Sequence, residues 1–514
     1  MRLSHRYPRA AVATPHYLAS TAGAAVLADG GNAVDAIVAA NLALGVVAPY
    51  FCGYGGDLFA IVWDGDLHGY LGSGRSPAAA TRERVEARAG GRAMPVFGPD
   101  SVTVPGGVRG WFDLLERFGT RSFGELTCFA VRYATEGFEM TTLGARAIEE
   151  GRHMYGQFAA WQAAYGDVQL GDVLCQPGMA RTIELLAQDG PNAYYRGPIA
   201  DAIASSVQEL GGDMAAADLA AHAGEWVEPL RQSFHGVEVA ELPPPTQGVS
   251  ALEALRILDS VDLPPNGVER VHVMIEATKL ALADRDRWVS DPATMPRPAE
   301  ELLTDAWIKA RAAEIDPRRA VTPSGVDPQP GGTAYLCAAD ADGLLVSLIQ
   351  SNFVHFGSGV HVAEWGINLN NRGFSFSLDP DRVNAFEPSK RPMHTLIPAM
   401  TLRDGRPDLV FGSMGGDAQV PVHVQVLTRI IDDGEDPADA IAAPRWRLDT
   451  GSWNVRAETR LAPELVEGLR ALGHDVTETT AYDTGMGHAH AVWPSSQGLG
   501  ATYDPRSEGA ALGC

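Results

Sequence analysis

A segment rich in proline and glycine runs directly into a strand that begins at a threonine, and this junction constrains the chain more than any other feature. Residues 315–332 contain four prolines and three glycines, so we expect an exposed linker that holds no long helix. Residues 333–340, which follow at once, have the apolar character of a strand. A hydroxyl amino acid, Thr333, therefore stands where a flexible segment meets a rigid one.

The chemistry of threonine makes this position a candidate for catalysis. A threonine hydroxyl is a weak nucleophile unless a base lies beside it, and cutting the chain before Thr333 would supply that base as a free α-amino group. Gly331 and Gly332 would suit such a cut because they are small and flexible. The junction alone also fits a simpler interpretation, in which Thr333 opens a strand because of its β-propensity.

The residues after Thr333 predict a β-hairpin that adds polar neighbours. A turn at residues 341–343 leads into a second expected strand, residues 344–351. A turn centred on Ala341 and Asp342 places Thr333 opposite Gln350, whereas a turn centred on Asp342 and Gly343 places it opposite Asn352. Either register brings the polar residues 350–352 beside Thr333, although an ordinary polar strand end would give the same pattern.

A glycine pair marks a third element of the candidate site. Gly415 and Gly416 follow a strand expected at residues 408–411 and precede a helix expected from Asp417 to Ile431. Backbone N–H groups at such a turn are suited to binding an oxyanion. A purely conformational requirement would also explain two adjacent glycines.

Composition and termini exclude several classes of function. Forty basic and 64 acidic residues give a net charge of −24, which disfavours nucleic acid and anionic membranes as partners. The longest apolar stretch, residues 36–48, is interrupted by Asn41 and is too short to span a bilayer. The start of the chain has no secretory signal, so we predict a cytoplasmic protein. Five widely spaced cysteines form neither a disulfide framework nor a zinc site.

Seven short motifs then follow one another along nearly the whole chain. They are GGNAVDA at 30–36, VPGGVRG at 104–110, PPPTQG at 243–248, ADR with DP at 283–292, GGTAYL at 331–336, KRP at 390–392 and GSMGG at 412–416. In this order they resemble the γ-glutamyltransferase family of N-terminal nucleophile hydrolases.

The resemblance implies an α+β fold, a four-layer αββα sandwich, and a proenzyme that cuts itself between Gly332 and Thr333. The large subunit, residues 1–332, and the small subunit, residues 333–514, would stay together as one structural domain. Thr333 would be the nucleophile with its own α-amino group as base, and Ser351 would support it in place of a second threonine. Gly415 and Gly416 would form the oxyanion hole, and no metal or organic cofactor is implied.

The candidate substrate-binding residues depart from the family pattern. Arg75 corresponds to the arginine that pairs with the α-carboxylate of a γ-glutamyl group, but it stands two positions closer to the following proline. Arg372 and Ser375 replace a glutamine and an aspartate, which would otherwise meet the substrate's α-ammonium. His394 and Thr395 replace a pair of serines, and Asn352 is shifted by one position.

These departures shape the expected function. A cation at 372 would repel an ammonium group, so we expect a small-molecule amide whose acyl group carries a carboxylate, such as a dicarboxylic half-amide. Two alternatives stay open: a genuine γ-glutamyltransferase or glutathione hydrolase, and an inactive family member that acts as a binding or scaffold protein. The balance of hydrolysis and transfer, and any higher homo-oligomer, are also left open.

Overall fold

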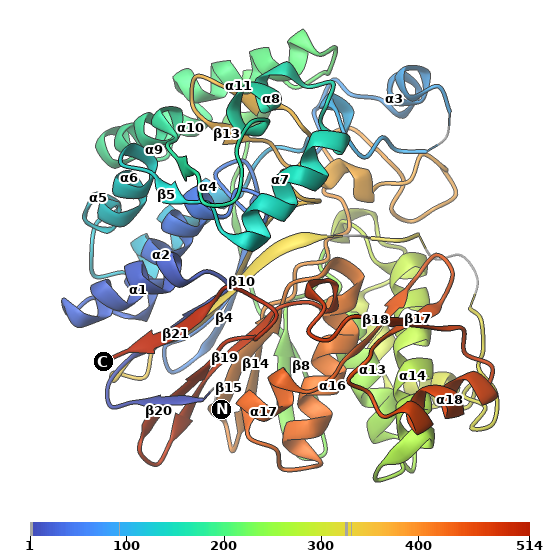
Figure 1. Ribbon diagram of the computed structural model, residues 1–514. Coiled ribbons are helices and arrows are strands. Elements are labelled where there is room, and N and C mark those ends of the chain that lie inside the picture. The colour runs from blue at the N-terminus through green and yellow to red at the C-terminus, as the bar shows by residue number, and fades with distance from the viewer. Residues whose placement is uncertain (1–3, 92, 324–326, 330) are drawn as a thin grey trace.

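Two seven-stranded β-sheets form the centre of the computed structural model, which describes residues 4–91, 93–323, 327–329 and 331–514 (Figure 1). All neighbouring strands in both sheets are antiparallel. Sheet I contains, in spatial order, β21 (Ala510–Gly513), β2 (Ala11–Thr14), β10 (Gly332–Ala339), β11 (Leu345–Phe353), β3 (Asp57–Trp63), β4 (Leu67–Gly72) and β7 (Glu225–Val227). Sheet II contains β1 (His5–Tyr7), β20 (Gly498–Thr502), β19 (Ala489–Ser495), β15 (Arg406–Ser413), β14 (Ala399–Arg403), β9 (Val237–Glu241) and β8 (Leu230–Phe234).

Side-chain alternation explains how the sheets stack. In β10, Tyr335 and Cys337 join a buried apolar cluster with Met400 and Val410 of sheet II, so they point into the space between the sheets. The intervening residue Leu336 instead joins the core between sheet I and the helices. Odd-numbered residues of β10, including Thr333, therefore face the inter-sheet layer.

Helices cover the outer face of each sheet (Figure 1). Helix α2 contacts β10 and β11 of sheet I, whereas α16 contacts β15 of sheet II. The helices before residue 221 are α1 (Tyr17–Ala28), α2 (Ala33–Val47), α3 (Arg82–Ala89), α4 (Gly107–Phe118), α5 (Phe123–Leu126), α6 (Cys128–Thr135), α7 (Thr142–Met154), α8 (Ala159–Tyr165), α9 (Pro177–Asp189), α10 (Asn192–Tyr195), α11 (Pro198–Glu209) and α12 (Ala216–Ala220). The later helices are α13 (Gly248–Asp259), α14 (Gly267–Trp288), α15 (Asp305–Ala312), α16 (Gln419–Ile431), α17 (Pro437–Ala442) and α18 (Pro463–Ala471).

The four layers confirm the predicted αββα sandwich. The smaller strands outside the two main sheets are β5 (Phe138–Glu139), β6 (Val173–Leu174), β12 (His361–Val362), β13 (Ile367–Asn368), β16 (Trp446–Asp449), β17 (Asn454–Glu458) and β18 (Val476–Thr479).

None of the helices in the described part of the chain has the length and apolar character needed to span a bilayer.

Helix α2 shows how the local sequence builds the outer layer. Asn32 accepts a hydrogen bond from Asp35 N, and the Asp35 carboxylate accepts one from Asn32 N, which closes a capping box. The Asp340 carboxylate at the end of β10 accepts a further hydrogen bond from Ala33 N at 2.8 Å. The strand that begins at Thr333 is therefore fixed at its far end to the buried helix behind it.

The segment before Thr333 is only partly as predicted. Residues 315–323, 327–329 and 331 of the predicted linker form no helix or strand, as expected, whereas Gly332 already belongs to β10. Residues 324–326 and 330 lie outside the described residues. The linker is not exposed throughout, however, because Gln329 is buried and its backbone is bonded to Asp417. The end of the linker is thus held against the turn before α16, whereas we expected it to be exposed and flexible.

Candidate active site

A β-bulge beside Thr333 sets the geometry of the site. Gly332 pairs with Phe353 and Ala334 pairs with Gln350, so Ser351 and Asn352 together oppose the single residue Thr333. Residues 350–352 therefore lie beside Thr333 as expected, but the ladder from Ala334 to Ala339 is offset by one residue from both predicted registers. The reason is the turn, in which Asp340 N bonds to Leu344 O across three residues and Gly343 adopts a φ of 88°.

Two hydroxyl groups and one carbonyl meet at the bulge. Thr333 Oγ1 lies 3.1 Å from Ser351 Oγ, and Ser351 Oγ donates to Gly332 O at 2.6 Å. Ser351 Oγ also accepts from Phe353 N at 2.8 Å. Because a serine hydroxyl has one proton and Gly332 O receives it, the Thr333 hydroxyl is the donor to Ser351. The carbonyl that precedes Thr333 is thereby polarised.

The glycine pair lies against the backbone just before Gly332. A side-chain Cβ at Gly331 would come within 2.9 Å of Gly416 N and Cα, so only glycine permits this approach. Gly415 and Gly416 have φ values of 133° and 59°. Asp417 N donates to Gln329 O at 3.0 Å, and Gln329 N donates to an Asp417 carboxylate oxygen at 2.8 Å.

Two motif residues support this glycine turn from behind. Gln247 Nε2 donates to Gly416 O at 3.1 Å, and Arg285 Nη1 donates to Gln247 Oε1 at 2.8 Å. Arg285 is fully buried in α14 and is paired with Asp417 and Asp286. The motifs at 243–248, 283–292 and 412–416 thus meet in one network, a role that the sequence alone did not show.

Three of the predicted substrate-binding residues form a buried polar cluster, which we call the Arg372 cluster: Arg372, His394 and Thr395, together with Asp57. The fourth, Ser375, lies in the same short 3₁₀ helix as Arg372 (Arg372–Ser375). Arg372 Nη1 donates to Thr395 Oγ1 at 3.3 Å, and its guanidinium lies 3.7 Å from the centre of the Phe353 ring. Arg372 Nε and Nη2 and Ser375 Oγ have no hydrogen-bond partner among the described residues. The cluster thus holds hydrogen-bond donors without partners, and they lie beside Phe353 at the end of β11.

Asp57 is the acidic member of the cluster, and the sequence reasoning missed it. It pairs with Ser351 across β3 and β11, and its Oδ2 lies 3.0 Å from His394 Nε2. Burial raises the pKa of Asp57 to about 7, against the opposing charge of Arg372. Burial likewise lowers the pKa of Arg372 to about 9, against the charge of Asp57. An aspartate at the start of the apolar strand at residues 57–63 was the signal available in the sequence.

The structure does not bring Arg75 or Asn352 into this cluster. Arg75 Nη1 donates to Asp291 Oδ2 at 2.8 Å and to Ser389 O at 3.0 Å, and its side chain is about half exposed at 48%. Asn352 Nδ2 donates a hydrogen bond to Pro49 O at 3.3 Å and to no member of the Arg372 cluster. Their roles in substrate binding stay predictions that these contacts do not support.

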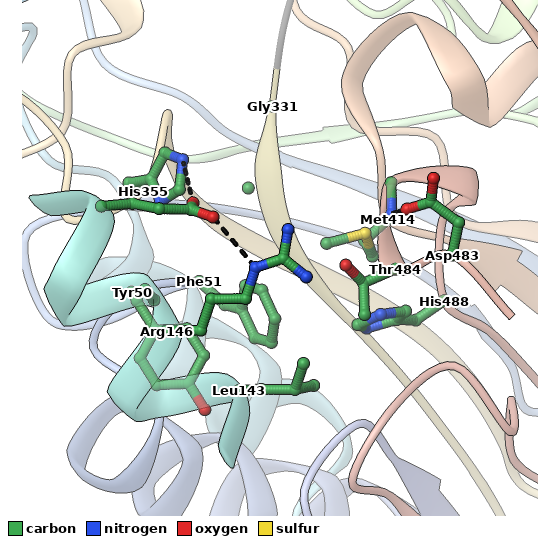
Figure 2. Close-up of a pocket in the computed structure, with 14 residues that line it drawn as sticks. Tyr50, Phe51, Leu143, Arg146, Gly331, His355, Met414, Asp483, Thr484 and His488 are labelled. Carbon is green, nitrogen blue, oxygen red and sulfur yellow. Dashed lines mark hydrogen bonds and ion pairs between the residues drawn. The ribbon is translucent and has the colours of Figure 1, made fainter. Parts of the chain in front are cut away.

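A cavity of about 270 Å³ opens beside Gly332 (Figure 2). Its walls combine apolar and charged side chains, and Gly331 and Gly332 form part of them. The lining residues are Tyr50, Phe51, Leu143, Arg146, Ala147, Glu150, Gly331, Gly332, His355, Met414, Asp483, Thr484, Gly485 and His488. We call this the Arg146 cavity, and none of its lining residues belongs to the Arg372 cluster.

One buried group has side chains of the kind that bind metals: His272, Glu276 and His474. His272 Nδ1 lies 2.7 Å from His474 Nε2, and the Lys279 ammonium donates to Glu276 at 2.8 Å. Val321 N donates to the same carboxylate. Because these bonds already use the candidate ligand atoms and place a cation among them, we assign no metal to this group.

Comparison with known proteins decides the family. The sequence model described as Gamma-glutamyltranspeptidase matches residues 19–514. The chain belongs to the γ-glutamyltranspeptidase family. It is 39% identical to the "Oxamate amidohydrolase proenzyme" of Klebsiella pneumoniae, with 97% of each chain covered. It is 36% identical to the "Glutathione hydrolase-like YwrD proenzyme" of Bacillus subtilis, with 98% of each covered.

Solved structures of the family agree with the fold. The crystal structure of cephalosporin acylase from Bacillus halodurans superimposes with a TM-score of 0.95 at 35% identity, covering 100% of this chain and 97% of that one. These relatives are hydrolases and acylases, and the chain is an enzyme with the amidohydrolase or acylase activity of the γ-glutamyltranspeptidase family. The expectation of an enzyme is thereby confirmed, and the alternative of an inactive scaffold protein is set aside.

Proposed function

We propose that this enzyme is a self-processing threonine amidohydrolase that cleaves amides of dicarboxylic acids lacking an α-amino group. One observation carries the choice of substrate: Arg372 is buried, and two of its three guanidinium nitrogens, Nε and Nη2, are unpaired among the described residues. Unpaired buried donors are costly unless a ligand satisfies them. A carboxylate satisfies a guanidinium through two parallel hydrogen bonds.

Self-processing would begin at the Gly332 carbonyl. Thr333 Oγ attacks its carbon, the Gly332–Thr333 C–N bond breaks, and the hydroxyl proton passes to the freed Thr333 amine. The ester so formed is hydrolysed by water, which leaves a Gly332 carboxylate and a free Thr333 hydroxyl. The hydrogen bond from Ser351 to Gly332 O supports this step because it stabilises negative charge on that oxygen.

The same groups would then act on the substrate. The Thr333 α-amino group takes the proton of the Thr333 hydroxyl, which attacks the amide carbon and forms an ester with the acyl group. The amine leaves with that proton, and water hydrolyses the ester. Gly415 and Gly416 are proposed to donate their N–H groups to the oxyanion, which accords with the close approach of Gly416 to Gly331.

A γ-glutamyl substrate is the second candidate, because Asp57 places a carboxylate in the Arg372 cluster where an ammonium could bind. The bonds of Asp57 weigh against it: Oδ2 accepts from His394, and Oδ1 accepts from Gly106 N at 3.2 Å and Gly74 N at 3.4 Å. The oxamate named in the Klebsiella relative carries a carboxylate and no amine, which favours the first candidate.

Two measurements test the proposal. Purified enzyme should run as fragments of 332 and 182 residues, with Thr333 at the new N-terminus, while Thr333→Ala stays one chain. Processed enzyme should hydrolyse glutaryl-p-nitroanilide with a higher kcat/KM than γ-glutamyl-p-nitroanilide, and Arg372→Gln should remove most of that preference. An uncut wild-type chain would refute the processing step, and the opposite substrate ranking would refute the role of Arg372.

A further inference from the structure

Two chemically different spaces flank the Gly332–Thr333 junction. The Arg372 cluster is closed, with Arg372 only 1% exposed, and it adjoins Phe353. The Arg146 cavity is open to solvent and adjoins His355, two residues further along the chain. An acyl group that stays bound to Thr333 needs a fixed partner, whereas the departing amine and the incoming water need an exit and an entrance. The open space therefore suits the amine part of the substrate.

Arg146 is the one arginine among the described lining residues, which also carry the carboxylates of Glu150 and Asp483. It lies on α7, its side chain is 66% exposed, and its Nε donates to Glu150 Oε1 at 3.0 Å. Figure 2 shows its guanidinium directed across the cavity toward Thr484 and His488. Within the described part of the chain, no hydrogen-bond partner is recorded for Nη1 or Nη2. The end of the guanidinium is thus available to a ligand.

His488 supplies a neutral polar group on the opposite wall. It is 1% exposed, and neither ring nitrogen has a partner among the described residues. Its ring stands edge-on to Phe51, and its carbonyl accepts from Met414 N at 3.1 Å, which ties it to the residue before the glycine pair. Burial lowers the pKa of His488 to about 4, so at neutral pH the ring is uncharged and adds no second positive charge to the cavity.

We propose that the Arg146 cavity binds the leaving amine, and that Arg146 selects amines that carry a carboxylate. This inference rests on the proposed function, which names the acyl group and leaves the amine open. Glu150 holds the Arg146 side chain in place through Nε, so the two terminal nitrogens can receive the carboxylate in parallel.

Two substrates with the same acyl group test it. Processed wild type is assayed with glutaryl-p-nitroanilide and with glutaryl-3-carboxy-4-nitroanilide, which differ only in a carboxylate on the leaving amine. Arg146→Gln should lower kcat/KM for the carboxylated substrate about tenfold, and should leave the plain anilide within about twofold. Arg146→Lys should restore part of the loss. Comparing variants cancels the intrinsic reactivity difference between the two anilides.

Controls separate this inference from the proposed function. Arg403→Gln, which removes an exposed arginine paired with Asp408, should leave both substrates unchanged. If wild type hydrolyses both anilides and Arg146→Gln changes them equally, the inference is wrong while the proposed function stands. If processed wild type hydrolyses neither, the proposed function is wrong, and the inference fails with it.

Discussion

Ser351 donates a hydrogen bond to the Gly332 carbonyl in the uncut chain, and a substitution at Ser351 removes this bond while keeping the proposed nucleophile Thr333. Its hydroxyl donates to Gly332 O at 2.6 Å, so Ser351→Ala should slow self-cleavage by about a hundredfold, the usual effect of losing one donor to an oxyanion. Gel electrophoresis over time after refolding measures the rate. Ser351→Thr keeps the hydroxyl and should cleave at a rate close to that of wild type, and equal rates for Ala and wild type would contradict the role.

Asp57 predicts a specific dependence of stability on pH. Burial raises its pKa from 3.8 to about 7, so the folded enzyme holds this proton more tightly than the unfolded chain does. The contribution of Asp57 to stability is therefore full below about pH 4 and is lost as the pH rises through 7. Asp57→Asn cannot titrate, so its free energy of unfolding should improve relative to wild type between pH 5 and pH 8.

Urea denaturation of both proteins at several pH values measures this difference. Asp408→Asn, at an exposed position paired with Arg403, is the matched control and should show no comparable trend. A constant difference between Asp57→Asn and wild type across this pH range would show that Asp57 is ionised throughout.

At the scale of elements, a buried ion network fastens the loop between β20 and β21. Asp504 accepts hydrogen bonds from Ala489 N and Arg506 N, and lies 2.8 Å from Arg445 Nη2 and 3.2 Å from Arg506 Nη1. Asp504→Asn should cost about 3–5 kcal/mol, because it leaves two buried guanidinium groups under-compensated. An exposed substitution such as Asp408→Asn should cost less than about 1 kcal/mol.

The ionised Asp504 carboxylate also makes the stability of the network depend on pH at the acidic end of the range. Burial alone would raise the pKa of Asp504, but Arg445 and Arg506 overcome it and hold the pKa well below the usual range. This contribution is present above about pH 4 and is lost as the pH falls further. The stability gap between wild type and Asp504→Asn, measured by thermal unfolding, should therefore shrink from pH 6 to pH 3, and a constant gap would contradict the ionised state.

The elements were predictable where local sequence controls them. The helix expected from Asp417 to Ile431 is α16, Gln419–Ile431, and the strands expected at 333–340 and 344–351 are β10 and β11. The register beside Thr333 was not predictable, because Asn352 N bonds to Phe51 O and Phe353 adopts a φ of 79°, and both depend on distant chain segments. The partner of the Arg75 side chain was not predictable for the same reason, since Asp291 is 216 residues away in the sequence.

At the scale of the whole molecule, the net charge of the chain is negative, whereas both candidate binding sites contain a positively charged arginine. The chain carries a net charge of −24, yet the Arg372 cluster and the Arg146 cavity each present guanidinium N–H groups without recorded partners in the described residues. The net charge therefore bears on solubility and excluded partners, while the proposed anion recognition rests on two local positions. The motifs in the sequence located the first of these positions, and only the folded arrangement reveals the second.

The arrangement of strands in the two sheets predicts that the two fragments stay together after self-cleavage. Strands from both proposed subunits alternate within each sheet: β10 and β11 lie between β2 and β3, and β14 pairs with β9. Separating the fragments would break these ladders and expose the core between the sheets, so the cut enzyme should stay one particle. Size-exclusion chromatography should give the same elution volume for cut wild type and for uncut Thr333→Ala.

Denaturing gels of that peak should show two fragments for wild type and one chain for Thr333→Ala. Thermal unfolding of the cut enzyme should be a single transition, because neither fragment retains a complete sheet. Adding urea should release the fragments only over the range in which the fold is lost. Fragments that elute separately in native buffer would show that the shared sheets do not hold the subunits together.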